Sequence, residues 1–320
     1  MNKVLNKHIL AALCAAPLFL GSSFAFADDA AAPAAEAPAA VDAAAAAAPA
    51  EPAPPYTITF NLGITSAYVS RGVTINDVPS LQGGIDWAHS SGFYLGAWAS
   101  TANPLVLGKG TPELPTAPNG AALGGGNHVE TDWYGGYTHA FGPVTLGIGG
   151  NYVWYPEGEK SYHDRNQDTF EGNVNVSAYG FTYTFYHAFT DWYGIGDLRH
   201  NLIAPGTPTA AGSMADTSGV EYHEIKYANS LPFGGLNFNA KVGYQRSSDI
   251  CLNQKDMLIG LSRSFSLPTA GKPIDGFTVG GAYTQAFGEE QCSKDGLYYT
   301  DDHFVQSNDR TLTFYLKRSW

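Results

Sequence analysis

Residues 56–64 read Tyr-Thr-Ile-Thr-Phe-Asn-Leu-Gly-Ile, and they set the pattern for the rest of the chain. Every even position is apolar, whereas every odd position is small or polar. A period of two places the apolar side chains on one face of an extended strand. The same alternation returns at 236–244. Similar segments, giving about twelve predicted strands in all, are 81–89, 93–100, 129–140, 144–154, 170–178, 181–189, 220–229, 256–265, 277–286 and 311–320.

The connections between these segments alternate in length. The short ones are 89–92, 141–143, 179–180, 231–235 and 267–275. The long ones are polar and rich in Gly and Pro, and they are 72–80, 101–127, 156–168, 191–219, 247–254 and 287–303. Short turns at one end and long loops at the other are typical of an outer-membrane barrel.

The composition favours the same architecture. Aromatic residues make up 13% of the 320 residues and charged residues only 14%, against about 25% charged residues in soluble domains. The polar faces of the strands are rich in Gly, Thr, Asn and Ser, which suits a hydrated interior inside a lipid-facing apolar surface. Aromatic residues near strand ends predict two interfacial belts, formed by Tyr56, Tyr68, Trp87, Phe93, Trp133, Phe141, Trp154 and Tyr155. We predict an all-β fold, a transmembrane antiparallel up-and-down β-barrel over 56–320; a soluble β-sandwich is the alternative.

Two segments precede the barrel. Residues 1–27 contain two lysines, a twelve-residue apolar stretch and the sequence Ala25-Phe26-Ala27, the three parts of a cleaved signal peptide. Residues 28–55 are nearly all Ala and Pro, which predicts a disordered periplasmic linker because proline interrupts helix. The predicted localisation is therefore the bacterial outer membrane, reached through the periplasm. The formal net charge of −12 argues against a nucleic-acid partner.

The last strand carries a further pattern. Trp320 ends the chain, and Phe314 and Leu316 share its phase. A terminal strand with an aromatic last residue resembles the recognition signal of the outer-membrane barrel-assembly machinery. Arg318 departs from that pattern, in which an apolar or aromatic residue is usual.

Three stretches resemble a known family. Residues 62–74 read Leu-Gly-Ile-Thr-Ser-Ala-Tyr-Val-Ser-Arg-Gly-Val-Thr, 79–87 read Pro-Ser-Leu-Gln-Gly-Gly-Ile-Asp-Trp, and 91–100 read Ser-Gly-Phe-Tyr-Leu-Gly-Ala-Trp-Ala-Ser. They look like the opening of the TorF family of porin-like proteins, Gcw-type conserved outer-membrane barrel proteins, which share a Thr-Ser-x-Tyr-x-x-Arg-Gly strand. The resemblance implies an outer-membrane barrel and no particular substrate.

Charged residues on the predicted inward faces are the candidate pore-lining residues. They are Asp86, Glu130, Asp132, Glu171 and Lys241, and Arg71 is expected to pair with an acid near the loop end. Acids inside a water-filled barrel favour cations. Ordinary salt bridges in the lumen are the alternative interpretation.

Two other patterns bear on bound groups. Cys251 and Cys292 lie in neighbouring long loops, and in an oxidising compartment they are candidates for a disulfide. Asp164 to Asp168 has the spacing of a calcium loop, but Thr169 stands where that motif needs Gly and Asn175 where it needs Glu. We interpret it as a solvated loop, and we predict no metal and no cofactor.

Three functions compete at this stage. The leading prediction is a passive channel for small solutes or ions, with a cation preference and with outer-membrane lipids as its surroundings. The second is a closed structural or surface-binding barrel, plugged by 101–127 or 191–219 and acting through its long loops. The third, an outer-membrane hydrolase, ranks last because Ser66 and Ser177 have no recognisable His/acid constellation. We therefore predict that the protein is not an enzyme, and its oligomeric state is left open.

Overall fold

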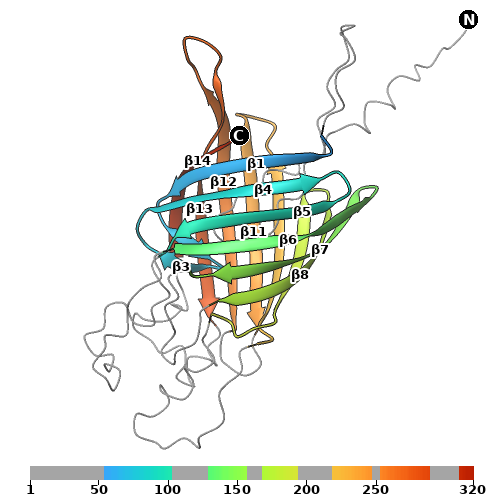
Figure 1. The fold of residues 1–320 in the computed structure, drawn as a ribbon. Coiled ribbons are helices and arrows are strands. Elements are labelled where there is room, and N and C mark those ends of the chain that lie inside the picture. Colours follow the sequence, from blue (N-terminus) through green and yellow to red (C-terminus); the bar gives the residue numbers. More distant parts are fainter. Residues whose placement is uncertain (1–53, 103–128, 157–167, 194–217, 247–252, 289–309) are drawn as a thin grey trace, which may run out of the picture.

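The wall of the molecule is one closed antiparallel barrel of twelve strands (Figure 1). The computed structural model describes residues 54–102, 129–156, 168–193, 218–246, 253–288 and 310–320. The strands follow the chain around the barrel, from β1 through β4 to β14, and β14 closes on β1. Their bounds are β1 Tyr56–Thr65, β4 Ser80–His89, β5 Phe93–Thr101, β6 Val129–Phe141, β7 Val144–Trp154, β8 Thr169–Ala178, β9 Phe181–Ala188, β10 Glu221–Ser230, β11 Leu236–Arg246, β12 Gln254–Leu267, β13 Ile274–Gly288 and β14 Arg310–Ser319.

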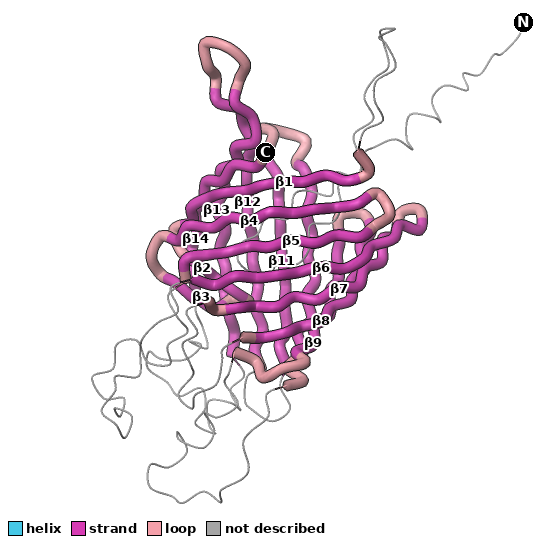
Figure 2. The backbone as a smooth tube through the Cα atoms, viewed as in Figure 1, coloured by secondary structure: helices cyan, strands magenta, loops and turns pink. Residues whose placement is uncertain are grey.

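The predicted closed antiparallel barrel of about twelve strands is thus confirmed, and each predicted segment forms a strand of the wall. The signal peptide 1–27, the linker apart from its last two residues, Cys251 and Cys292 lie outside the described residues. Figure 2 shows the described chain as strands and loops. Within these ranges no helix is long and apolar enough to cross a bilayer.

The two faces of the wall differ as the alternation predicts. On β1, Ile58, Leu62 and Ile64 point outward and are about half exposed. On the inward face of the same strand, exposure falls from the exposed Thr57 to the buried Thr65. We call the end of the wall with short connections the turn end and the opposite end the loop end. On β1 the inward face is therefore exposed at the turn end and covered at the loop end.

Aromatic side chains gather at both ends of the outward face. At the turn end they pair across strands, with ring centroids of Phe93 and Tyr137 4.9 Å apart and of Phe181 and Tyr227 4.6 Å apart. At the loop end, exposed aromatic side chains include Trp133, Tyr152, Trp154, Phe170 and Phe189. Tyr68 and Tyr155 were expected in these belts, and this expectation is wrong because both are buried inside the barrel.

One connection at the loop end folds inward instead of outward. Between β1 and β4 the chain forms a hairpin of β2 (Tyr68–Ser70) and β3 (Val73–Asn76), a separate two-stranded sheet (Figure 2). Residues 72–80 were expected to be a long polar loop, and the structure instead makes them half of this hairpin. The hairpin covers the inward face of the loop half, and it forms the candidate functional site.

Candidate functional site

The turn of the hairpin is held in an unusual backbone conformation. Arg71 and Gly72 both have positive φ, 44° and 83°, which is the pattern of a two-residue type I′ turn. A Cβ added to Gly72 would meet the Cβ of Asp256 at 2.6 Å and that of Ala286 at 3.1 Å. The turn therefore lies directly against β12 and β13, and only glycine fits both the conformation and the space.

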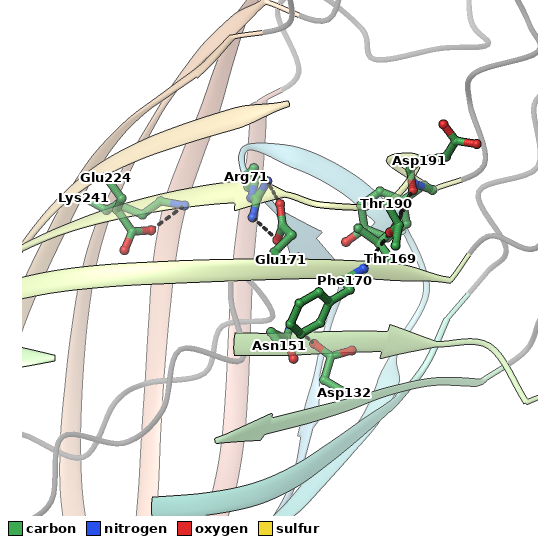
Figure 3. Close-up of polar contacts among 11 residues, drawn as sticks. Arg71, Asp132, Asn151, Thr169, Phe170, Glu171, Thr190, Asp191, Glu224 and Lys241 are labelled. Atoms are coloured by element: carbon green, nitrogen blue, oxygen red, sulfur yellow. Dashed lines mark hydrogen bonds and ion pairs between the residues drawn. The ribbon is translucent and has the colours of Figure 1, made fainter. Parts of the chain in front are cut away.

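The Arg71 side chain reaches the wall at β8. Its Nη1 and Nη2 donate to Oε1 and Oε2 of Glu171, at 3.0 and 2.6 Å (Figure 3). The guanidinium carbon lies 4.4 Å from the ring centroid of Tyr222 and 5.4 Å from that of Tyr186. Arg71 and Glu171 are both buried, so this is a bidentate, charge-assisted pair sheltered from water.

A second polar group lies beside this pair. The Gln254 side chain on β12 donates to the backbone oxygen of Arg71 at 2.9 Å. Lys241 lies between Asp256, at 3.1 Å, and Glu224, at 3.9 Å, and Figure 3 shows the contact with Glu224. The hydroxyl of Tyr222 donates to Asp256 at 3.0 Å. The tip of the hairpin thus rests on a buried network drawn from β8, β10, β11 and β12.

Near its base, the hairpin contacts β6. The hydroxyl of Tyr68 donates to Glu130, and that of Tyr155 donates to the other oxygen of the same carboxylate at 2.5 Å. Burial, and after it the charge of Glu130, hold the pKa of Tyr155 well above its ordinary value. The phenol therefore stays protonated and donates to Glu130. Tyr68 also packs edge-to-face on Trp98 at 5.8 Å, within a buried cluster that includes Tyr94 and Tyr134.

Where the hairpin leaves and rejoins the wall, it is tied to β14. The backbone nitrogen of Ser66 donates to the Phe314 oxygen at 2.8 Å, and the Phe314 nitrogen donates to the Ser66 hydroxyl at 3.0 Å. The hydroxyls of Thr74 and Thr311 are 2.7 Å apart. The hairpin thus spans the lumen between β6, β8, β12 and β14.

At the height of the β2–β3 hairpin, the inward face of the barrel is buried on every strand. Each of the twelve wall strands contributes there an inward residue less than a tenth exposed: Thr65, Ser80, Ser100, Asp132, Val153, Glu171, Tyr186, Glu224, Gln245, Asp256, Thr284 and Thr313. In the turn half, the inward residues Thr57, Thr59 and Ser264 are exposed, whereas Ser177, Ser262 and Thr278 are buried. The inward face is therefore partly exposed in the turn half and covered on every strand at the level of the hairpin.

Four of the six predicted pore-lining residues meet at the hairpin: Arg71, Glu130, Glu171 and Lys241. Asp132 lies at the same level and accepts from Asn151 at 3.4 Å. Asp86 lies nearer the turn end and accepts a hydrogen bond from Tyr134.

Several residues of the site were not predicted from the sequence. Glu224 was not predicted because Tyr222 and Ile225 place 220–229 in conflicting phases. Asp256 is the first residue of the weakly alternating segment 256–265, and Gln254 lies in the predicted long loop 247–254. Residues 101–127 and 191–219, predicted as plugs, lie almost wholly outside the described residues, and the plug that the structure shows is 66–79.

The structure describes some of the residues considered for metal binding and for catalysis. In the parts of the chain that the structure covers, no group of three or more His, Cys, Asp or Glu could hold a metal ion. Of the calcium-like stretch only Asp168 is described, and its carboxylate accepts from the Tyr155 nitrogen at 3.1 Å and the Tyr152 hydroxyl at 3.0 Å. Ser66 bonds β14, and the Ser177 hydroxyl lies 2.9 Å from that of Thr182.

A family described as "Bacterial protein of unknown function (Gcw_chp)" matches residues 49–320. No curated protein matches the sequence.

Among solved structures, the KdgM porin is similar at 6% identity and a TM-score of 0.41, over 82% of this chain and 98% of that one. The NanC porin is similar at 9% identity and a TM-score of 0.39, over 82% and 98%. OccK5 (OpdH) of Pseudomonas aeruginosa is similar at 11% identity and a TM-score of 0.32, over 81% and 62%.

Proposed function

The chain belongs to the bacterial family of unknown function Gcw_chp, and we propose that it is an outer-membrane channel for small hydrophilic solutes or ions. In this proposal the β2–β3 hairpin forms the narrowest level of the lumen and the inward acids favour cations. The observation that carries the proposal is a polar inward face, exposed at Thr57, Thr59 and Ser264 in the turn half, that leads to a plug with buried polar contacts.

The outward face supports the membrane placement. Large apolar side chains around the whole wall are 36% exposed or more, among them Leu95, Ile148, Ile225 and Leu312. A soluble protein rarely exposes so continuous an apolar surface. Closure of the sheet satisfies the strand backbone without an edge, as hydrocarbon requires. Two aromatic belts flank the apolar band, where the headgroups would lie.

The charges around the hairpin support the cation preference. Five buried acids face the lumen at this level: Glu130, Asp132, Glu171, Glu224 and Asp256. Three bases face them: the buried Arg71 and Lys241, and the partly exposed Lys226, which pairs with Glu224 at 2.7 Å. An excess of acids at a constriction lowers the free energy of a cation there relative to an anion.

The way in which the hairpin is held supports a plug that can move. Its tip is fixed by an ion pair with Glu171 and by the Gln254 amide, and its base by a hydrogen bond to Glu130 and by the packing of Tyr68 on Trp98. Water can replace the polar contacts, so the net free energy of each of them is modest. Both ends of the hairpin remain tethered to adjacent strands, so displacement would leave the wall intact.

A second function is favoured by the same burial. If the ring of buried inward residues does not open, the protein is a closed barrel that acts through its long extracellular loops. Deleting the plug separates the two functions. In the test variant, residues 67–78 are replaced by a short Gly-Ser linker, and both proteins are recorded in planar bilayers under a KCl gradient.

We expect the natural chain to conduct with a reversal potential on the cation side, and the deletion to raise the conductance. A silent natural chain with a conducting deletion variant would favour the closed barrel. If neither conducts, the channel is refuted. An anion-side reversal potential in the natural chain would refute the cation preference alone.

Partners and assembly are proposed on the same basis. The barrel closes where Phe60 and Trp320 exchange backbone hydrogen bonds of 2.9 and 3.0 Å, with their rings stacked 6.2 Å apart. Phe314 and Leu316 lie on the same outward face as Trp320. This last strand supports recognition by the barrel-assembly machinery, with outer-membrane lipids as the surroundings. We propose no catalytic role, since Ser66 and Ser177 are engaged in structural hydrogen bonds.

A further inference from the structure

The outward face of the wall carries its bases in one sector. All outward-facing lysines and arginines among the described strand residues lie on β11, β12 and β14: Arg246, Lys255, Arg263, Arg310 and Arg318. The outward faces of β1 and β4 to β10 have none in those ranges. The whole chain has a net charge of −12, so this concentration of positive charge runs against the overall composition.

Arg318, the residue that departs from the assembly pattern, belongs to this sector. Its guanidinium carbon lies 5.4 Å from the ring centroids of both Phe277 and Trp320, and its Nε donates to the backbone oxygen of Asp275 at 3.2 Å. The two rings belong to the turn-end aromatic belt. The arginine is thus held at the level where hydrocarbon would meet headgroups, and its side chain leans toward β13.

Arg263 lies at the same end, on the other side of β13. It is exposed and pairs in register with Val279, while Arg318 pairs with Phe277, the next outward residue of β13. Two strand spacings and two residues of rise separate their Cα atoms by about 12 Å, a gap that two extended arginine side chains can close. Within the described ranges, no carboxylate forms an ion pair with either arginine.

Two arginines without an anion at the edge of an apolar band need a counter-charge. Guanidinium groups bind phosphate through paired hydrogen bonds, and they keep their charge at any physiological pH. The groups that a bilayer offers at this depth are lipid phosphates. Val279 and Phe277 between the arginines offer an apolar strip on which acyl chains can lie.

We propose that Arg263 and Arg318 form a binding site for the phosphate of an anionic phospholipid, across β13 at the turn end. This inference rests on the proposed membrane placement, and it is independent of whether the lumen conducts. It gives Arg318 a role that outweighs the small cost of a charge near the interface, about 0–1 kcal/mol.

The test is native mass spectrometry of the full barrel, released from detergent in the presence of equal amounts of phosphatidylglycerol and phosphatidylethanolamine with the same acyl chains. We expect the natural chain to retain phosphatidylglycerol preferentially. Each arginine removed should lower that affinity about fivefold, so the variant R263Q/R318Q loses most of the preference. R263K/R318K keeps both charges and should retain part of it.

Controls keep this result apart from folding and from channel function. K272Q removes an exposed base in the turn that joins β12 and β13 and should leave the lipid preference unchanged. R318Q could impair assembly, which heat-modifiable migration on gels would reveal. In that case R263Q alone is tested, and it should lower the affinity for phosphatidylglycerol about fivefold.

Equal retention of both lipids by the natural chain would overturn the inference. So would a preference that survives in R263Q/R318Q. A barrel that conducts but retains no phosphatidylglycerol refutes this site alone. A barrel that retains it but does not conduct supports the site and refutes the channel.

Discussion

Replacing Glu171 by glutamine should free the hairpin from the wall while leaving the wall itself intact. Glutamine keeps the shape of the side chain and one acceptor oxygen, but it removes the charge that holds the Arg71 guanidinium at 2.6 and 3.0 Å. Both partners are buried. The arginine charge then loses its bidentate carboxylate partner, while its contacts with the faces of Tyr222 and Tyr186 remain.

The expected size of the effect follows from the burial. Removing one partner of a buried ion pair costs about 3–5 kcal/mol, and the retained amide oxygen places E171Q at about 3 kcal/mol, the lower end of that range. The displaced hairpin does not bear this cost, because water solvates Arg71 there. At 1.4 kcal/mol for each factor of ten, the displaced fraction should rise about a hundredfold.

Thiol labelling measures that fraction without depending on conductance. Val69 is buried on β2, so V69C, with Cys251 and Cys292 replaced by serine, reacts with a charged maleimide only when the hairpin leaves the lumen. We expect E171Q to speed labelling about a hundredfold.

The matched control is E224Q, which also removes one buried inward carboxylate but one that contacts Lys226 and Lys241. Equal labelling rates in E171Q and the parent would refute the reasoning. An equal acceleration in E224Q would show that lumen charge, and not the contact with Arg71, controls the hairpin.

Three further changes probe the same architecture. G72A places a Cβ at a residue with positive φ, where it would contact β12, and should lower the free energy of unfolding in urea by about 1–3 kcal/mol. The control G142A, at φ 64° with open space around it, should lower it less. Y68F removes a donor to Glu130 and should lower the unfolding free energy by about 1–3 kcal/mol, a loss that thermal melting monitored by heat-modifiable migration would detect. W320A removes the ring stacked at the closing seam and should reduce the folded barrel in outer-membrane fractions; an unchanged yield would show that the terminal aromatic is dispensable.

The strands of the wall could be predicted because each one shows its apolar alternation within its own short stretch of sequence. A strand with one lipid-facing side repeats every two residues, and β1 shows this over its whole length of ten residues. The hairpin could not be predicted in the same way. β2 and β3 have three and four residues, too few to show a period, and Arg71-Gly72 is not one of the Asn-Gly or Asp-Gly pairs that mark a type I′ turn.

The site was predictable only as a set of residue types. Arg71 was expected to pair with an acid near the loop end, and it does, but its partner Glu171 lies 100 residues away in the chain. Which acid it meets depends on the register of the five intervening strands, β3 to β7, and on the inward bend after Thr65. Glu224 was missed for a different reason, because its strand has no clear inward phase in the sequence.

The motif that carries the family resemblance acquires a physical meaning from this bend. Ser66 ties the start of the hairpin to β14, Tyr68 bonds Glu130, Arg71 bonds Glu171, and Gly72 supplies the positive φ and the close approach at the turn. A lipid-facing wall needs only alternation, and many residue types can supply it. A hairpin folded into a lumen needs particular groups at particular positions. In this chain, the residues that carry the resemblance at 65–72 are therefore residues of the plug.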